Sequence, residues 1–315
     1  MNKLPLVIVN PASAGGATAD AWPGAASELR RHFGAFECYF TKARGDARAV
    51  AERAARAGRR LVVACGGDGT INEVADGILR AGAGAELGIL PSGTGGDFRR
   101  TLGVPRSTRE AARSLREGRA RVMDAGRVTF FDADGREETR HFVNVASVGM
   151  GGDVIKRVKS GPAWLKGSGV GLLGGSVAFA AAALGSAFAF EKPRVRVRVD
   201  GGPEFRLTVA NLCVANARYF GGGMKIAPTA RLDDGLFDVV AVGDMAAHEI
   251  LLNSYRVYLG THLGMRQVGH ARARTVTTSA DGDDKVELEI DGEIAGLLPA
   301  TFEILPNALR VRSPR

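Results

Sequence analysis

The sequence predicts two domains of different class: an α/β domain with an open parallel sheet, followed by an all-β, sandwich-like domain. Short apolar runs alternate with Ala- and Arg-rich helical stretches up to about residue 125, and strand-like alternation replaces that rhythm afterwards. The chain has 315 residues, 45% of them hydrophobic, which is enough for two hydrophobic cores. We therefore expect a first domain over 1–125 and a second over 126–299.

The first part of the chain has the rhythm of βαβ units. We expect strands near 4–9, 36–40, 61–65 and 87–90, and helices near 20–32, 46–58 and 71–82. Ligands of open parallel sheets bind at the carboxyl ends of the strands. The glycine-rich segments of the chain follow the expected strands, so we expect them at this edge of the sheet.

The second part of the chain has the pattern of antiparallel strands. Arginine and valine alternate over 194–199, which is typical of a strand with one wet face and one packed face. Similar runs predict further strands at 140–147, 205–216, 236–242, 272–278 and 285–291, with a helix near 246–260.

Two glycine-rich segments carry the functional signal. Residues 65–74 read Cys-Gly-Gly-Asp-Gly-Thr-Ile-Asn-Glu-Val, and residues 91–98 read Pro-Ser-Gly-Thr-Gly-Gly-Asp-Phe, each directly after an apolar run. Glycine lets the backbone approach an anion closely, and the start of a following helix offers unpaired N–H groups. Two such segments predict one shared phosphate-binding site.

Composition narrows the partners. The chain has 42 basic and 34 acidic residues, a net charge of +8, which favours anionic partners such as nucleotide phosphates and acidic lipid headgroups. The arginines are scattered without the aromatic or motif spacing of a nucleic-acid binder, so we expect no nucleic acid. Cys38, Cys65 and Cys213 have no metal-ligand spacing, and we expect buried, reduced thiols in a cytoplasmic protein.

The glycine-rich segments resemble the signatures of the diacylglycerol kinase catalytic family, soluble lipid kinases that include sphingosine and ceramide kinases. The resemblance continues through a first nucleotide loop at 10–16, a threonine segment at 41–45, and blocks at 144–149, 221–228, 232–236 and 291–293. It implies an NAD-kinase/phosphofructokinase-like first domain to which about 300–315 return, and a lipid-binding second domain. Gly96 departs from the family, which usually carries asparagine there.

The same resemblance implies ATP and Mg²⁺ as cofactors. We expect the nucleotide to be held by Asn10, Pro11, Ala12, Ser13, Ala14, Thr41, Gly66, Gly67, Asp68, Gly69, Thr70, Asn72, Glu73, Gly93, Thr94 and Gly95. Phosphoryl transfer asks the protein mainly to position the triphosphate, neutralise its charge and align an acceptor hydroxyl.

Several acidic residues have competing interpretations. Asp68 stands in a phosphate loop, where a carboxylate is repelled unless a metal or donor network joins it to the anion, so it is a candidate catalytic residue and metal partner. The alternative is a turn or helix cap. For Glu73, a helix-terminus role competes with a nucleotide contact, and Asp97 and Asp124 are either caps or members of a polar network.

Two Asp-Gly segments of the second domain gain roles only through the resemblance. By spacing alone, 291–293 is a hairpin turn. The resemblance makes Glu293 the general base toward the lipid hydroxyl, with Asp291 assisting. It likewise makes 232–236 a structural Mg²⁺ loop, in which Asp234 gives its side chain and Arg231 and Leu236 their carbonyls. The alternative for this loop is a plain turn.

The stretch 156–190 is the candidate for membrane contact. Lys156, Arg157, Lys159 and Lys166 surround Trp164 and precede the uncharged run 170–190. The basic part favours docking on an anionic bilayer or a merely solvated face. The uncharged run is long enough to span a membrane, but its many glycines and alanines favour a buried helix.

The combined interpretation is an ATP-dependent kinase of diacylglycerol or a related lipid, peripherally membrane-associated and a possible homodimer. The alternatives are a sphingoid-base or phosphatidylglycerol kinase, an NAD kinase and a non-catalytic nucleotide-binding module.

Overall fold

A computed structural model describes residues 3–93, 95–151 and 191–314 of the chain. The chain divides into two compact units. The first unit contains Met1–Asp124 and Asn307–Arg315, and the second contains Ala125–Pro306.

The first unit is built on a parallel sheet with the strand order β2-β1-β3-β4, to which the end of β15 adds beside β4. The strands are β1 (Leu6–Val9), β2 (Glu37–Phe40), β3 (Leu61–Gly66), β4 (Glu86–Pro91) and the last part of β15 (Glu293–Ser313). Every residue of β1 and β3 is buried, because helices cover both faces of these central strands.

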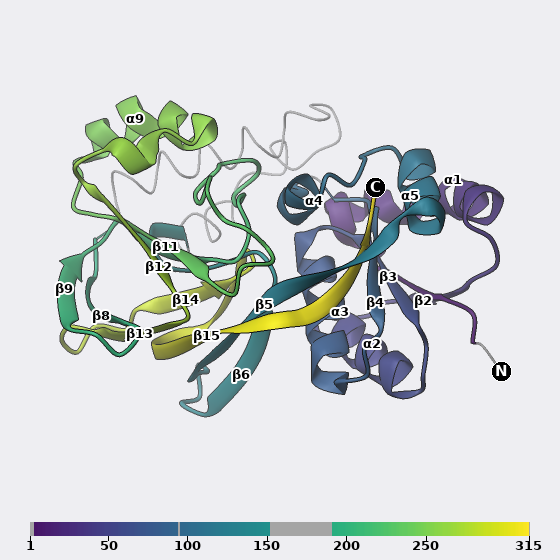
Figure 1. The fold of residues 1–315 in the computed structure, drawn as a ribbon, viewed down its shortest axis with the longest axis horizontal. Coiled ribbons are helices and arrows are strands. Elements are labelled where there is room, and N and C mark those ends of the chain that lie inside the picture. The colour runs from purple at the N-terminus through teal and green to yellow at the C-terminus, as the bar shows by residue number, and fades with distance from the viewer. Residues whose placement is uncertain (1–2, 94, 152–190, 315) are drawn as a thin grey trace. The chain divides into compact units, whose positions relative to one another are not determined.

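Helices cover the two faces of this sheet as separate layers (Figure 1). Helices α1 (Ala17–His32) and α5 (Thr108–Glu117) pack together on one face, and α2 (Asp46–Arg56) and α3 (Asp68–Ala81) pack on the other. The second pair is close because small residues meet there. A Cβ atom on Gly77 of α3 would lie 2.3 Å from the carbonyl oxygen of Arg48, and Ala51 of α2 is fully buried.

Four details of the first unit differ from the sequence-based expectations. Helix α3 begins at Asp68 rather than near residue 71, and two helices, α4 (Asp97–Leu102) and α5, follow β4. The 3-10 helix η1 (Ser13–Gly16) precedes α1. Cys38 is exposed, so the expectation that all three thiols are buried was wrong, whereas Cys65 and Cys213 are buried. The reason is that β2 lies at the edge of the sheet.

The second unit is an antiparallel sandwich in which the long strand β15 takes part in both sheets. One sheet has the order β12-β11-β10-β7-β14-β15. Strand β15 also pairs with β13 and with β5. Beyond β13 the pairing continues through β8 to β9, and beyond β5 it continues to β6. The bounds are β5 (Arg119–Phe131), β6 (Glu137–Phe142), β7 (Val145–Gly149), β8 (Arg194–Val199), β9 (Glu204–Thr208), β10 (Asn211–Ala215), β11 (Phe237–Val242), β12 (Val268–Ala273), β13 (Thr275–Ala280) and β14 (Glu287–Ile290).

Three of the expected strands are each two strands. The stretch 140–147 forms the end of β6 and the start of β7, 205–216 forms the end of β9 and all of β10, and 272–278 is divided between β12 and β13. The break between β12 and β13 lies at Arg274, whose N–H, like that of Thr275, donates to the Asp200 carboxylate at 2.8 Å and not to a neighbouring strand.

The core of the second unit lies between its sheets. Phe142 and Phe237 stack with ring centroids 5.5 Å apart, and Phe302 meets Phe142 edge-on. Val195 and Val197 of β8 are buried, as the arginine-valine alternation predicts. The expected fold class, a parallel α/β domain with a β-rich, sandwich-like one, is confirmed.

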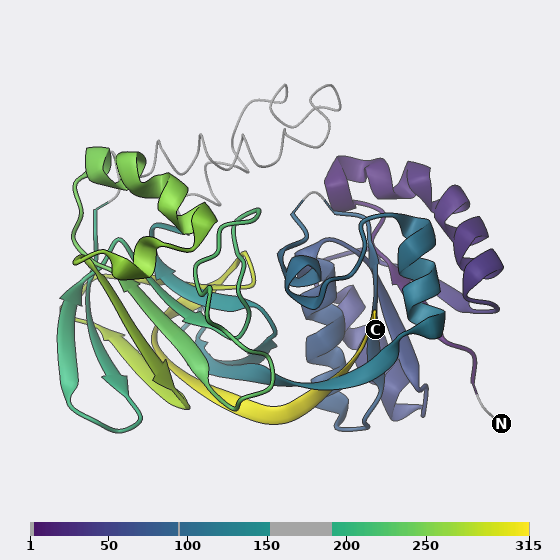
Figure 2. The ribbon, with the colours of Figure 1, turned by 45° about the horizontal axis from the view of Figure 1, so that its top comes forward.

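Helix α9 (Ala247–Leu259) and the 3-10 helix η2 (His262–Gly264) connect β11 to β12 on the outside of the second unit (Figure 2). Within the described ranges, no helix has both the length and the hydropathy that a membrane crossing requires. The whole stretch 156–190, on which the membrane prediction depends, falls outside those ranges.

Candidate active site

Three loops of the first unit converge at the carboxyl ends of β1, β3 and β4. The Ser92 N–H donates to the carbonyl of Gly66 at 3.1 Å, and a Cβ atom on Gly93 would lie 2.4 Å from the Cα atom of Gly67. The side chain of Ser13 also borders Gly67, at 3.4 Å from its Cβ position. The two glycine-rich segments are therefore in direct backbone contact, which glycine alone permits at these positions.

Asn10 joins the first loop to the second. Its amide donates from Nδ2 to Thr70 Oγ1 at 3.0 Å, and its Oδ1 accepts from the N–H of Ala12 at 3.1 Å. Thr70 lies in the first turn of α3 and is buried. The chain turns after Ala12, and Ala14 in this turn has a left-handed backbone conformation, with φ of 55°. Thr70 thus braces the first loop, whereas Thr94 lies outside the described residues.

The Asp68 carboxylate organises the third loop. It accepts three backbone N–H groups, from Gly96 at 2.7 Å, Asp97 at 3.1 Å and Phe98 at 3.1 Å. These are the first N–H groups of α4, so Asp68 acts as a cap for a helix that begins after the next strand along the chain. Asp97 itself is buried and pairs with Arg100 at 2.7 Å.

Glu73 caps a different helix. Its carboxylate accepts from the N–H groups of Gly45 at 2.9 Å and Ala47 at 3.1 Å, at the start of α2. The Thr41 N–H donates to the carbonyl of Val9, which brings the segment after β2 beside the end of β1. Glu73 therefore connects α3 to the segment that follows Thr41.

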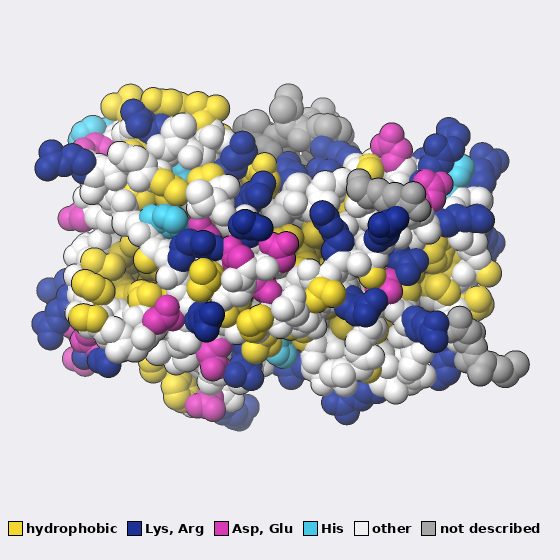
Figure 3. Space-filling view, in the orientation of Figure 1, with side chains coloured by type: hydrophobic (Ala, Val, Ile, Leu, Met, Phe, Trp, Pro, Cys, Tyr) yellow, Lys and Arg dark blue, Asp and Glu magenta, His cyan; other side chains and the backbone are white. Residues whose placement is uncertain are grey.

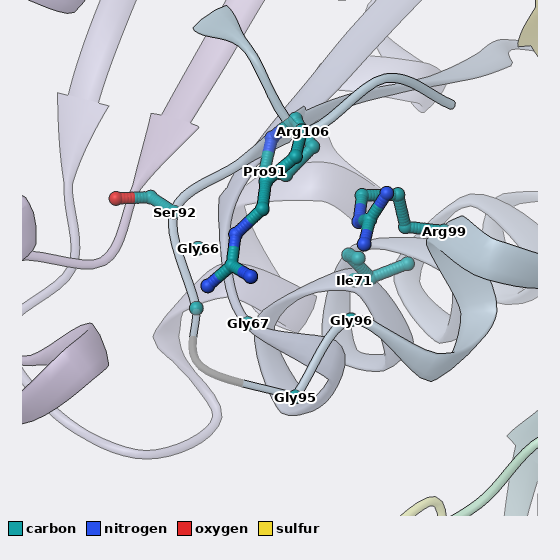
Figure 4. A pocket seen from close by; sticks show the side chains of 10 residues that line it. Gly66, Gly67, Ile71, Pro91, Ser92, Gly95, Gly96, Arg99 and Arg106 are labelled. Carbon is teal, nitrogen blue, oxygen red and sulfur yellow. The ribbon is translucent and has the colours of Figure 1, made fainter. Parts of the chain in front are cut away.

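Arg99 and Arg106 line a cavity of about 120 Å³ together with the glycine-rich segments. Figure 4 shows the Arg106 guanidinium directed toward Gly66 and Gly67, and the Arg99 side chain near Ile71 and Gly96. Burial, and next the neighbouring positive charges of Arg100 and Arg106, lower the pKa of Arg99. An anion in this cavity would relieve that repulsion. Two arginines beside this glycine backbone fit an anionic group such as a phosphate.

The sequence analysis missed both arginines. Neither lies in a recognised motif, and Arg106 is more than ten residues beyond the glycines that it faces. The only available signal was the basic cluster directly after the second glycine-rich segment.

In the second unit, Asp291 is a buried carboxylate at a hairpin turn. It accepts the N–H groups of Val143 at 3.0 Å, Asn144 at 3.0 Å and Val145 at 2.8 Å. Asp291 and Gly292 have φ values of 47° and 83°, as a two-residue hairpin between β14 and β15 requires. The turn interpretation is thus realised, and the three hydrogen bonds also tie the turn to the Asn144 segment.

Glu293 begins β15 opposite Ile290 and is half-buried. Because Asp291 fixes the turn on one side and strand pairing fixes it on the other, the backbone of Glu293 is held firmly.

The Asp234 loop offers hard oxygen donors, as Mg²⁺ prefers. One Asp234 oxygen accepts the Leu236 N–H at 3.1 Å, and the other pairs with the Arg272 guanidinium. The chemistry of the carboxylate and of the Arg231 and Leu236 carbonyls fits Mg²⁺, which would compete with Arg272. In the described part of the chain, no three His, Cys, Asp or Glu side chains gather as a metal-binding group.

Two family models match the chain. The model for the diacylglycerol kinase catalytic domain matches residues 5–128, and that for the YegS C-terminal NAD kinase beta sandwich-like domain matches residues 167–313. Together with the phosphate-type cavity, these matches define the class of the protein as that of the lipid kinases.

The relatives agree with this class. The chain is 32% identical to a Pseudomonas aeruginosa protein described as "Probable lipid kinase YegS-like", over 86% of this chain and 82% of that one. It is 29% identical to a Bacillus subtilis diacylglycerol kinase, over 87% and 84% of the two chains. A diacylglycerol kinase crystal structure from Bacillus anthracis superposes with a TM-score of 0.70 at 22% identity, covering 99% of this chain and 97% of that one. The chain belongs to the diacylglycerol kinase catalytic family and is a lipid kinase.

Proposed function

We propose that the chain transfers the γ-phosphate of ATP to a hydroxyl group of diacylglycerol or a related lipid at a membrane surface. The observation that supports it most is the convergence of three glycine-bearing loops beside Arg99 and Arg106, a site for a polyphosphate. The names of the relatives support a lipid as acceptor. In this proposal the β-rich second unit binds the lipid.

The residues of the chain have distinct parts in the proposed reaction. The backbone of Gly66, Gly67 and Gly93 approaches the phosphates, and Arg99 and Arg106 balance their charge. Asn10 and Thr70 hold the first loop in place. Bound Mg²⁺ supplies further charge neutralisation on the phosphates.

Glu293 is the proposed general base. It takes the proton of the lipid hydroxyl while the oxygen of that hydroxyl forms its bond to the γ-phosphorus and the bond to the β-phosphate oxygen breaks. Asp291 holds the turn and so positions Glu293. The Asp234 carboxylate and the carbonyls of Arg231 and Leu236 are the proposed ligands of a structural Mg²⁺.

The test is a transfer assay with radiolabelled ATP and Mg²⁺. The acceptors are diacylglycerol, sphingosine and phosphatidylglycerol in mixed micelles, and NAD in solution, with each product identified by mass spectrometry. We expect the label in a phosphate ester of one of the lipids. Labelling of NAD alone, or of no acceptor, would contradict the proposal.

A further inference from the structure

Helix α9 carries its largest apolar side chains on its outer surface. Five of its residues are among the exposed large hydrophobics of the protein: Leu251 at 45%, Leu252 at 68%, Tyr255 at 53%, Tyr258 at 39% and Leu259 at 64% exposed. No residue of α9 is buried. In Figure 3 these hydrophobic side chains form a continuous row over α9.

The five side chains lie on one face of the helix. At about 100° per residue, positions 251, 252, 255, 258 and 259 fall within an arc of about 120°. The opposite side faces the second unit, where Val257 packs against a buried cluster and its carbonyl accepts the Lys225 N–H at 2.9 Å. The helix is therefore held by its smaller apolar face, and its larger one is exposed to solvent.

A contiguous apolar stripe along one helix face is a candidate interaction surface. Leucine gives the stripe its apolar depth, and the tyrosines combine an apolar ring with a polar hydroxyl group, a composition typical of helices at a membrane–water interface. Arg256 lies over the Tyr255 ring at 5.8 Å, His248 of the same helix is exposed, and so is Arg266, which follows η2 in the chain.

The charge near the stripe is complementary to an anionic surface. Glu249 is the single acidic residue of α9, and its carboxylate accepts the N–H of Ala246 at 2.8 Å beyond the start of the helix. The chain as a whole carries a net charge of +8. Arginines beside an apolar stripe add attraction to anionic lipid headgroups.

We propose that this face of α9 docks on the surface of an anionic lipid bilayer, with the helix lying in the plane of the interface and its leucines inserted among the acyl chains. The inference rests on the proposed lipid kinase function, and it names the element that brings the second unit to the membrane. It involves different residues from the stretch 156–190.

The size of the stripe favours a bilayer over a second copy of the chain. A helix of 13 residues is about 20 Å long and, with its side chains, about 10 Å wide, so the stripe covers roughly 200 Å². A stable protein interface buries about 800 Å² on each partner. A bilayer has no such requirement, because a single inserted face suffices for reversible binding.

The test is sedimentation of the full chain with vesicles of phosphatidylcholine and phosphatidylglycerol in equal parts. Leu252→Glu with Leu259→Glu is the test variant. Phe205→Glu is the matched control, because Phe205 is 54% exposed but lies on β9. We expect the double variant to lower the vesicle partition coefficient at least tenfold and the control to leave it unchanged. Equal binding by all three proteins would overturn the proposal.

A spectroscopic probe gives a reading that does not depend on the double variant. Leu252→Cys is labelled with an environment-sensitive dye in a Cys38→Ser background, because Cys38 is exposed and the other two thiols are buried. We expect a blue shift with vesicles and none without them. No shift with bound vesicles would show that α9 does not insert.

Two further measurements separate this proposal from its alternatives. Analytical ultracentrifugation that finds a dimer broken by the double variant, with vesicle binding unchanged, would assign the face to a second copy and reject the bilayer. Transfer to a short-chain diacylglycerol below its micelle concentration tests the kinase function alone. If no transfer were detected while the chain still bound vesicles through α9, the kinase function would be refuted and the docking face would stand.

Discussion

Glu289 of β14 is the buried carboxyl group whose replacement gives the sharpest test of the second unit. Its side chain accepts a hydrogen bond from the Ser147 hydroxyl at 3.2 Å, and its other oxygen is buried without a hydrogen-bond partner among the described residues. A Cβ atom on Gly151 would lie 2.3 Å from that oxygen, so the site is tightly packed. Burial, with a smaller contribution from Glu287, raises the pKa of Glu289 to about 8 despite the bond from Ser147.

This raised pKa predicts that stability decreases as the pH rises. Below about pH 4.5 the group is protonated in the folded and unfolded chains alike. Between about pH 4.5 and 8 the unfolded chain loses the proton and the folded chain keeps it, so the free energy of unfolding falls. The loss is complete above the folded pKa and amounts to roughly 3 to 5 kcal/mol.

Glu289→Gln removes this titration and keeps the size of the side chain. We expect the free energy of unfolding of the variant, measured by urea and circular dichroism, to fall less between pH 5 and pH 8.5 than that of the wild type, by several kcal/mol. The difference between the two proteins cancels the other titrating groups. Glu204→Gln, on the exposed part of β9, is the control for the change of charge. Parallel pH profiles for wild type and Glu289→Gln would refute the reasoning.

Four further changes test the candidate active site. Glu293→Ala should lower kcat by about 10²- to 10⁴-fold with ATP binding kept, and normal turnover would remove Glu293 as the base. Arg106→Ala should raise KM for ATP about tenfold more than it lowers kcat. Arg113→Ala, on the exposed face of α5, is its control. If both variants had the same kinetics, a contact of Arg106 with the phosphates would be excluded. Asp68→Ala should cost about 2 to 3 kcal/mol of stability, because three N–H groups lose the carboxylate that accepts from them, and it should weaken Mg-ATP use; wild-type stability would exclude the cap. Asp234→Ala should lower the melting temperature, and a chelator should do so only in the wild type; a wild type indifferent to chelator would assign the loss to the Arg272 ion pair alone.

The location of the candidate phosphate site could be predicted from sequence because it follows from periodicity. Apolar runs that alternate with helices predict a parallel sheet, and glycines directly after those runs must then lie at one edge. The contact of Gly67 with Gly93 confirms that the two segments are adjacent. Chain direction and turn chemistry, both local properties, were sufficient for this prediction.

Side-chain partners distant in sequence could not be predicted in this way. The hydrogen bonds that Asp68 accepts from Gly96–Phe98, and that Asp291 accepts from Val143–Val145, depend on how strands are ordered in a sheet. The sequence does not distinguish a carboxylate beside glycine that forms a turn from one that caps a helix or binds a metal, because all three roles use the same oxygen atoms. The exposure of the apolar stripe of α9 could not be predicted for a similar reason. The sequence of an amphipathic helix shows that it has an apolar face but not whether other residues cover that face.

Gly96 is a position where a local backbone requirement and a distant side-chain partner act together. The family resemblance raised the question of what glycine does where asparagine is usual, and the structure gives Gly96 a φ of 72°, in the left-handed region. Asparagine is one of the few non-glycine residues that adopt this conformation readily. Both residues can therefore present the N–H group that Asp68 accepts at 2.7 Å. The shared requirement is a backbone conformation, so the departure from the family preserves the loop that Asp68 and α4 hold in place.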